Sequence, residues 1–278
     1  MEIGAIIFAT AYSIQVDELA RELEARGFGS LVLPEHTHIP TSRQSPWPGG
    51  GELPKEYSHT YDPFVALSFA AAATTKLKLA TGICLVAQRD PIATAKSVAS
   101  LDVLSGGRVI FGIGGGWNVE EMNQHGVQYK TRFKQLREHV LTMKALWTED
   151  EASFHGEFVN LEPTWSWPKP IQRPHPPVII GGETDYTINR VIEFGDGWLP
   201  RASPNFDPTV GMTRLREAAD KAGRDMSSLS VSVFRAPPDA QTLESYAQAG
   251  IERSLLMLPS DDRDTVLRLL DEYAPLVA

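Results

Sequence analysis

The sequence has almost no cysteine and no long uncharged apolar run. Cys84 is the only cysteine among 278 residues, which excludes an internal disulfide and a thiolate metal cluster and makes a reducing cytoplasm the expected location. No stretch has the apolar length of a membrane span, and the N-terminus lacks the basic segment of a signal peptide. The 26 Lys and Arg residues against 35 Asp and Glu residues give a net charge of −9. Because so acidic a body repels a phosphate backbone, no nucleic-acid partner is expected.

Short β-type runs alternate with amphipathic helices from one end of the chain to the other. The first helix has apolar residues from Val16 to Leu23 at i, i+3, i+4, i+7 spacing and ends at Gly27. An Asp-Pro pair, which marks a capped helix start with proline in the first turn, occurs three times, at 62–63, 90–91 and 207–208. The predicted strands are 3–8, 30–34, 77–86, 108–113, 177–180, 197–199, 229–234 and 253–258.

Eight strand–helix units of this kind predict a (β/α)8 TIM barrel, which needs ~250 residues. Strands joined through helices run parallel because the crossovers are right-handed. A doubly wound open sheet is the alternative, although no reversal of strand order marks its switch point. We treat residues 1–278 as one domain with two insertions on the C-terminal rim, 37–58 and 153–176. The second contains a predicted hairpin turn at 155–157, and long connections of this sort are often lids or interface elements.

The strand-to-helix rim, where barrels place function, carries Glu35-His36-Thr37-His38 after the second strand. A His-x-His pair is compatible with a metal, but later strand ends supply no further histidine or carboxylate for it. The two histidines could instead bond to loop carbonyls. The third interpretation is that His36, at the strand end, donates a proton or hydrogen bond to a bound ligand.

Two glycine-rich segments also lie on this rim. Gly181-Gly182 precede a helix that begins near Thr184, and such a turn is either a phosphate cradle, with free N–H groups in the first helical turn, or a plain turn. The run 112–116 is not a dinucleotide fingerprint, because the final glycine is replaced by Trp117. It provides a surface without side chains, suited to a flat ring or to close helix packing.

Other polar and aromatic groups have structural explanations. The acidic pairs 120–121 and 261–262 are interpreted as solvated helix faces and helix caps. Trp47, Trp165 and Trp167 are equally well explained as lid aromatics and as buried packing residues.

The segment 104–117, Leu-Ser-Gly-Gly-Arg-Val-Ile-Phe-Gly-Ile-Gly-Gly-Gly-Trp, with the acidic pair 120–121 after it, resembles the bacterial luciferase-like superfamily. Segments 34–40, 176–182 and 195–198 strengthen the resemblance, which spans nearly the whole chain and favours the branch that uses coenzyme F420. It implies a (β/α)8 barrel with a flavin-like ring in its mouth.

The resemblance implies an F420-dependent oxidoreductase that transfers a hydride between the deazaflavin and a small organic substrate. An FMN-dependent monooxygenase on the same scaffold is one alternative. A non-catalytic flavin-binding barrel is an alternative from another class. Related barrels often dimerise, so a homodimer is expected.

The resemblance also implies site residues. The Gly82–Ile83 bond matches a non-proline cis peptide that supports the ring from behind. The predicted catalytic residues are His36 and Glu35, and Glu35 stands where an aspartate is familiar in the family. No metal is expected. The predicted cofactor-binding residues are Thr81, Gly82, Ile83, Gly114, Gly116, Asn118, Ile180, Gly181, Gly182 and Thr184.

Overall fold

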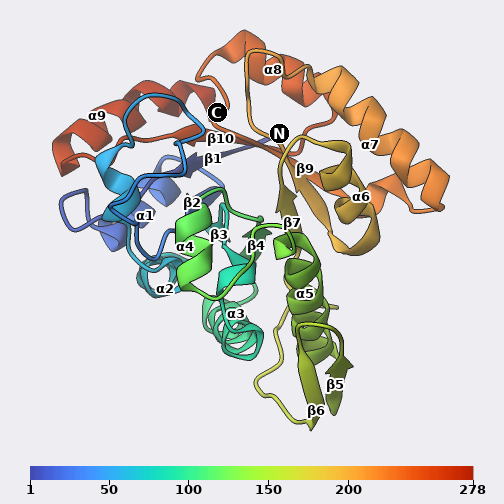
Figure 1. Ribbon diagram of the computed structural model, residues 1–278. Coiled ribbons are helices and arrows are strands. Elements are labelled where there is room, and N and C mark those ends of the chain that lie inside the picture. Colours follow the sequence, from blue (N-terminus) through green and yellow to red (C-terminus); the bar gives the residue numbers. More distant parts are fainter. Residues whose placement is uncertain (278) are drawn as a thin grey trace.

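The computed structural model, which describes residues 1–277, has eight parallel strands closed into a barrel and surrounded by helices (Figure 1). This confirms the predicted (β/α)8 fold. The order around the barrel is β1-β10-β9-β8-β7-β4-β3-β2. The barrel strands are β1 (Glu2–Ile6), β2 (Ser30–Leu33), β3 (Lys78–Thr81), β4 (Val109–Ile113), β7 (Val178–Gly181), β8 (Gly197–Leu199), β9 (Ser230–Phe234) and β10 (Arg253–Met257).

Each barrel strand leads into a helix on the outer ring. All three Asp-Pro pairs begin helices, with the aspartate side chain accepting from backbone N–H groups of the first turn. The helices are α1 (Val16–Ala25), α2 (Pro63–Ala73), α3 (Pro91–Ser105), α4 (Val119–Gln124), α5 (Arg132–Thr148), α6 (Asp185–Phe194), α7 (Pro208–Ala222), α8 (Ala240–Ala249) and α9 (Arg263–Tyr273).

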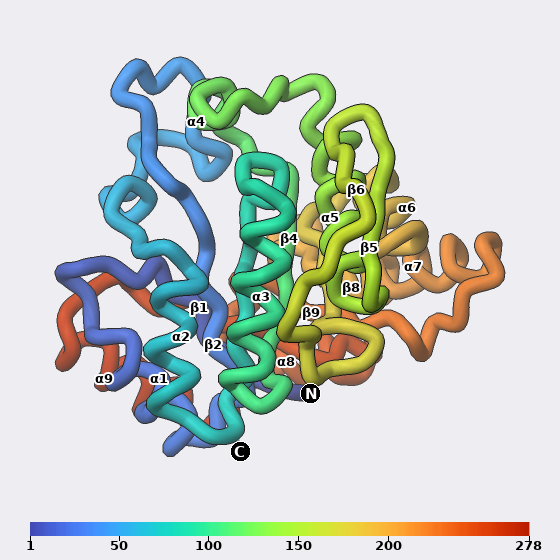
Figure 2. Tube along the Cα trace, turned by 90° about the horizontal axis from the view of Figure 1, so that it is seen from below, coloured from blue at the N-terminus to red at the C-terminus, as the bar shows by residue number. Residues whose placement is uncertain are grey.

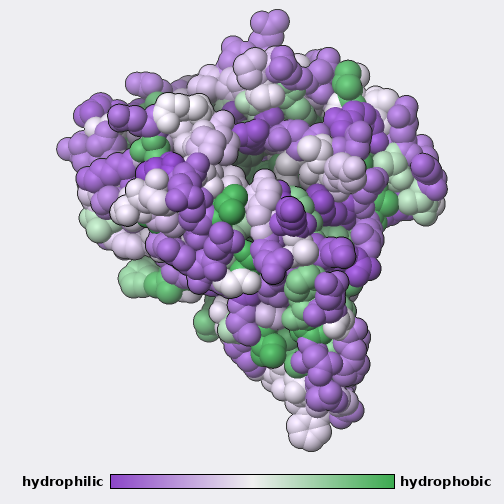
Figure 3. Space-filling view, viewed as in Figure 1, coloured by the Kyte–Doolittle hydropathy of each residue, from purple (hydrophilic) through white to green (hydrophobic). Residues whose placement is uncertain are grey.

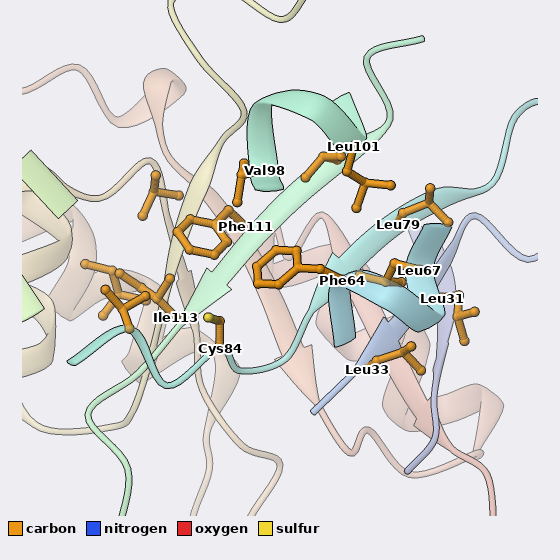
Figure 4. Packing of buried hydrophobic residues seen from close by; sticks show 14 of the residues in the cluster. Leu31, Leu33, Phe64, Leu67, Leu79, Cys84, Val98, Leu101, Phe111 and Ile113 are labelled. Carbon is orange, nitrogen blue, oxygen red and sulfur yellow. The ribbon is translucent and has the colours of Figure 1, made fainter. Parts of the chain in front are cut away.

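Apolar side chains fill two regions, one inside the barrel and one outside it. The barrel interior holds a small layer with one or two residues from most strands, including Ile6, Val32 and Ile179. The larger core lies between the strands and the helices. Figure 4 shows part of it, where Phe64 and Leu67 of α2 and Val98 and Leu101 of α3 pack toward the strands. Because the lumen is filled, a ligand site belongs above the strand ends.

The two insertions have different structures. Residues 37–58 contain only a short 3-10 helix, η1 (Lys55–Ser58), and lie beside α4 on the barrel rim (Figure 2). The second insertion contains the predicted hairpin, made of β5 (Ala152–His155) and β6 (Asn160–Thr164). This hairpin packs against α5 (Figures 1 and 2).

The predicted strand 77–86 is wrong in its second half. Strand β3 ends at Thr81, the Gly82–Ile83 peptide bond is cis as the resemblance implied, and η2 (Val86–Gln88) follows. Leu85 and Val86 are buried. A buried apolar run has the same sequence signature whether it is extended or turned, so the pattern could not show where the strand ends. Within residues 1–277 no helix has the length and apolar character needed to cross a bilayer.

Candidate active site

A cleft of about 680 Å³ opens at the C-terminal ends of the barrel strands. Its volume is within the range of small-molecule and cofactor sites. The lining comes from the segments after β3, β4 and β7, from β8 and β9, and from α5 and α6. The lining residues are Pro48, Gly82, Ile83, Gly115, Gly116, Trp117, Arg132, Phe133, Gly181, Gly182, Glu183, Thr184, Tyr186, Thr187, Arg190, Leu199, Arg201 and Phe234.

The floor of the cleft is built from backbone and one branched side chain. Ile83 occupies the space between two glycines, since a Cβ on Gly114 would lie 2.0 Å from Ile83 Cδ1 and one on Gly181 would lie 3.1 Å from Ile83 Cγ2. Gly115 faces the Phe133 ring, where a Cβ would approach to 2.5 Å. Side chains at these glycines would displace Ile83 and Phe133, so the flat floor depends on their absence.

The turn between β7 and α6 presents free amides, although the amide of Gly182 is not one of them. Gly182 N–H donates to the Leu199 carbonyl at 3.3 Å, and Trp198 Nε1–H donates to the Gly182 carbonyl at 2.7 Å. The Gly182 amide is therefore not free for a ligand, because β8 occupies it. In residues 1–277 no acceptor pairs with the next four N–H groups, 183–186, which open α6. A helix start of this kind favours an anion.

Two arginines stand at this end of the cleft without a carboxylate. Arg132 and Arg190 both lie over the Phe133 ring, with their guanidinium carbons 4.3 Å and 3.6 Å from its centroid. Among the described residues no carboxylate oxygen lies within 4.0 Å of either one, and Arg132 Nε is buried without a hydrogen-bond partner. Burial and repulsion from Arg132 lower the pKa of Arg190, and attraction to Glu193 offsets part of this shift. Two guanidinium groups held together without a paired carboxylate favour an anionic ligand.

His36 is buried on the rim beside the cleft and forms a chain with two other side chains. Its Nδ1 lies 2.8 Å from Glu121 Oε2, and its Nε2 accepts from Trp117 Nε1–H at 3.3 Å. Trp117 lines the cleft, whereas His36 does not line it and meets the indole edge to face, with ring centroids 5.7 Å apart. His38 is half-buried and contacts Thr37 and Gln124, away from the chain of Glu121, His36 and Trp117.

Glu35 points away from the cleft into an ion pair. Its Oε1 accepts from Arg89 Nε at 2.5 Å, its Oε2 accepts from Leu85 N–H at 2.7 Å, and the residue is only 4% exposed. Burial and the Glu35 charge raise the pKa of the Cys84 thiol, which therefore stays protonated. In this geometry Glu35 holds the segment after β3 in place.

The predicted cofactor-binding residues divide into those that line the cleft and those that support it. Thr81 Oγ1 donates to the Gly112 carbonyl at 2.7 Å, Ile180 is buried in the core, and Asn118 caps α4 by accepting from Glu121 N–H at 3.1 Å. Gly114 supports Ile83 from below. The remaining six line the cleft: Gly82, Ile83, Gly116, Gly181, Gly182 and Thr184.

Sequence reasoning missed the charged groups of the site. Glu121, interpreted as a solvated helix residue, is fully buried against His36, so that prediction is wrong. Arg132 and Arg190 were not identified. The one available signal was Arg190, which stands three residues after the buried Thr187 of α6, so helical spacing places a cation at the edge of the buried face.

The tryptophans of the second insertion are neither lid aromatics over the cleft nor buried packing residues. Trp165 and Trp167 are 80% and 59% exposed and do not line the cleft. Trp47 is half-buried against Tyr57, with ring centroids 5.8 Å apart. Among the described residues no three or more His, Cys, Asp or Glu side chains form a group that could hold a metal ion.

Comparison with known proteins gives a consistent family assignment. The family described as luciferase-like monooxygenase matches residues 10–254. An uncharacterised protein of Mycobacterium tuberculosis (strain H37Rv) is 39% identical over 285 residues, covering 100% of this chain and 99% of the relative. The FMNH(2)-dependent dimethylsulfone monooxygenase of Pseudomonas putida is 35% identical over 116 residues, 41% of this chain and 32% of that protein.

Among solved structures, the coenzyme F420-dependent tetrahydromethanopterin reductase of Methanopyrus kandleri superposes with a TM-score of 0.74. The alignment covers 100% of both chains at 17% identity. At this identity the likeness establishes the shared fold alone.

Proposed function

The chain belongs to the luciferase-like monooxygenase family, and from that membership we propose that it is an oxidoreductase transferring a hydride between coenzyme F420 and a small organic substrate. When bound, the cofactor supplies the hydride chemistry, while the protein supplies orientation, electrostatics and exclusion of water. The observation that carries the proposal is a single cleft that joins a flat floor of glycines and Ile83 to an end where Arg132 and Arg190 have no paired carboxylate in residues 1–277.

The residues of the cleft fit a planar ring with an anionic tail. Gly82, Ile83 and Gly116 would lie against the ring, because they leave its floor flat. The free amides of 183–186 and the guanidinium groups of Arg132 and Arg190 would hold a phosphate. The buried Arg132 Nε, which has no partner among the described residues, would gain an acceptor.

The arginines at one end of the cleft support F420 as the cofactor in preference to FMN. FMN carries one terminal phosphate, whereas F420 carries a phosphodiester followed by glutamate carboxylates. Within residues 1–277, Arg132 and Arg190 provide two cations without a paired carboxylate, and Arg201, at the same end, is paired only with the partly exposed Glu183 at 2.9 Å. Several cations along one edge match a tail with several separate charges better than one with a single charge.

His36 is the proposed acid–base group. With its Nδ1 directed at a carboxylate, the ring presents the Nε2 lone pair toward the indole that lines the cleft. A 3.3 Å contact is long for a hydrogen bond, so a substrate group that moves closer could replace Trp117 as the partner. His36 then accepts or returns a proton at Nε2 when the hydride moves.

Fluorescence titration with F420 tests the cofactor assignment. We expect F420 to bind and a deazaflavin lacking the phosphate and glutamates to bind much more weakly, because the amides and arginines act only on the tail. FMN and riboflavin form the matched pair on the flavin side. Tight FMN binding without F420 binding would replace this proposal by an FMN-dependent monooxygenase, the class of enzyme to which the Pseudomonas relative belongs by its name.

The third possibility is a flavin-binding barrel without catalysis. His36→Ala separates it from an enzyme, since this variant should keep cofactor affinity and lose turnover. If the parent protein binds F420 but neither reduces nor oxidises it with any of the donors and acceptors supplied, the non-catalytic barrel is favoured. Unchanged turnover in His36→Ala would instead exclude His36 as the acid–base group.

We also propose that the protein forms a homodimer through the outer face of α2 and α3. Helix α2 has no charged residue, and its outward side chains include Val65 and Phe69, which are 61% and 63% exposed. Leu104 of α3 is also exposed, and Figure 3 shows hydrophobic side chains gathered at the lower left, over α2. A helix that is apolar on both faces is usually covered on both.

A further inference from the structure

Glu121 is the buried carboxylate that contacts the His36 ring, and its two oxygens have separate partners. Oε2 lies 2.8 Å from His36 Nδ1, and Oε1 accepts from Thr37 N–H at 3.1 Å. Both side chains of the pair are almost fully buried, 6% exposed for His36 and 0% for Glu121. The contact therefore lies in a low-dielectric environment where hydrogen-bond direction matters.

The Glu121 carboxylate and the Trp117 indole N–H, on either side of the His36 ring, decide which ring nitrogen carries the proton. An ionised carboxylate only accepts hydrogen bonds, and an indole N–H only donates. The ring between them satisfies both contacts in one neutral form, with a proton on Nδ1 and a lone pair on Nε2. The opposite tautomer would place two donors, His36 Nε2–H and Trp117 Nε1–H, against each other.

We infer that Glu121 is a positioning residue that fixes His36 in the Nδ1–H form and, through His36, holds the Trp117 indole as a wall of the cleft. The effect on turnover rests on the proposed function, in which His36 exchanges a proton at Nε2. The tautomer and the indole contact are properties of the protein alone. They can be measured without cofactor or substrate.

The neighbouring acidic residue provides a matched control. Glu120 stands beside Glu121 on the same helix, but its carboxylate accepts from Ser45 N–H at 2.9 Å and from the Ser45 hydroxyl. It anchors the first insertion and has no contact with His36. Removing the charge at 120 or at 121 changes the same helix by the same chemistry. The two variants differ in the partner that is lost and in burial, since Glu121 is fully buried and Glu120 is half-buried.

Nitrogen-15 NMR of labelled histidine reports the tautomer directly. In the parent protein we expect the His36 proton on Nδ1 and a hydrogen-bonded Trp117 indole. In Glu121→Gln the amide oxygen remains opposite Thr37 N–H, so the NH2 group faces Nδ1 and the proton moves to Nε2. The Trp117 indole then loses its acceptor and its resonance shifts, whereas Glu120→Gln leaves both signals in place.

Trp117→Phe tests which neighbour sets the tautomer, and it stays informative if Glu121→Gln does not fold. The proton should remain on Nδ1 when the indole is absent, because the carboxylate is unchanged. A parent protein with the proton on Nε2, or loss of the Nδ1 proton in Trp117→Phe, would overturn the inference. An unchanged tautomer in a folded Glu121→Gln would do the same.

Kinetics then connects the tautomer to the proposed function. In an active enzyme Glu121→Gln should lower kcat about 10²-fold or more, the size of a general acid–base contribution, with little change in the KM for F420. Glu120→Gln should keep the parental kcat. If the parent shows no F420-linked activity, the proposed function fails while the NMR result still decides the role of Glu121.

Discussion

Replacing Arg190 by glutamine tests the anion site at the α6 start. The guanidinium of Arg190 lies 3.6 Å from the Phe133 centroid and pairs with no carboxylate in the described chain. A hydrogen bond to a charged group contributes about 1.5–3 kcal/mol. At 1.4 kcal/mol per tenfold change, the Kd for F420 should rise about 10- to 150-fold.

Fluorescence titration measures this change, and Arg137→Gln is the control. Arg137 stands on α5, outside the cleft, and is paired with Glu193 at 2.5 Å. Its loss should leave F420 affinity unchanged. The double variant of Arg132 and Arg190 should cost less than the sum of the single variants, because both guanidinium groups share one ring.

Stability of the unliganded protein separates a ligand site from a structural one. Arg132 repels Arg190, so Arg190→Gln should leave the melting temperature unchanged or raise it while binding weakens. An F420 Kd within twofold of the parent value, or a clear loss of unliganded stability, would show that these arginines serve the fold and not an anion.

Three further predictions follow from single contacts. The hydrogen bond from the Ser45 side chain lowers the pKa of Glu120 to about 2. The ionised carboxylate therefore stabilises the fold fully above its ordinary pKa, and this contribution is lost as the pH falls toward 2. Chemical denaturation at several pH values should show a flatter stability curve in this range for Glu120→Gln. Gly112→Ala should destabilise the barrel by about 1–3 kcal/mol, since the Cβ would lie 2.0 Å from the Thr81 carbonyl oxygen. Phe69→Glu should convert the proposed dimer to monomers in sedimentation velocity.

Local sequence determined much of the fold. The Asp-Pro pairs mark three helix starts correctly because the cap and the proline act within four residues of each other. The alternation of strands and helices predicts the barrel because right-handed crossovers leave few other arrangements. The glycines of the floor could likewise be recognised in sequence, since the missing side chain is itself the signal.

Only the tertiary structure determined which charged residues come together at the site. Glu121 looks like any exposed helix residue until folding buries it against His36, 85 positions earlier in the chain. Arg132 and Arg190 come from different helices and meet only because both pack on Phe133. The partners of a charged side chain depend on its neighbours in space, and spacing along the chain does not encode them.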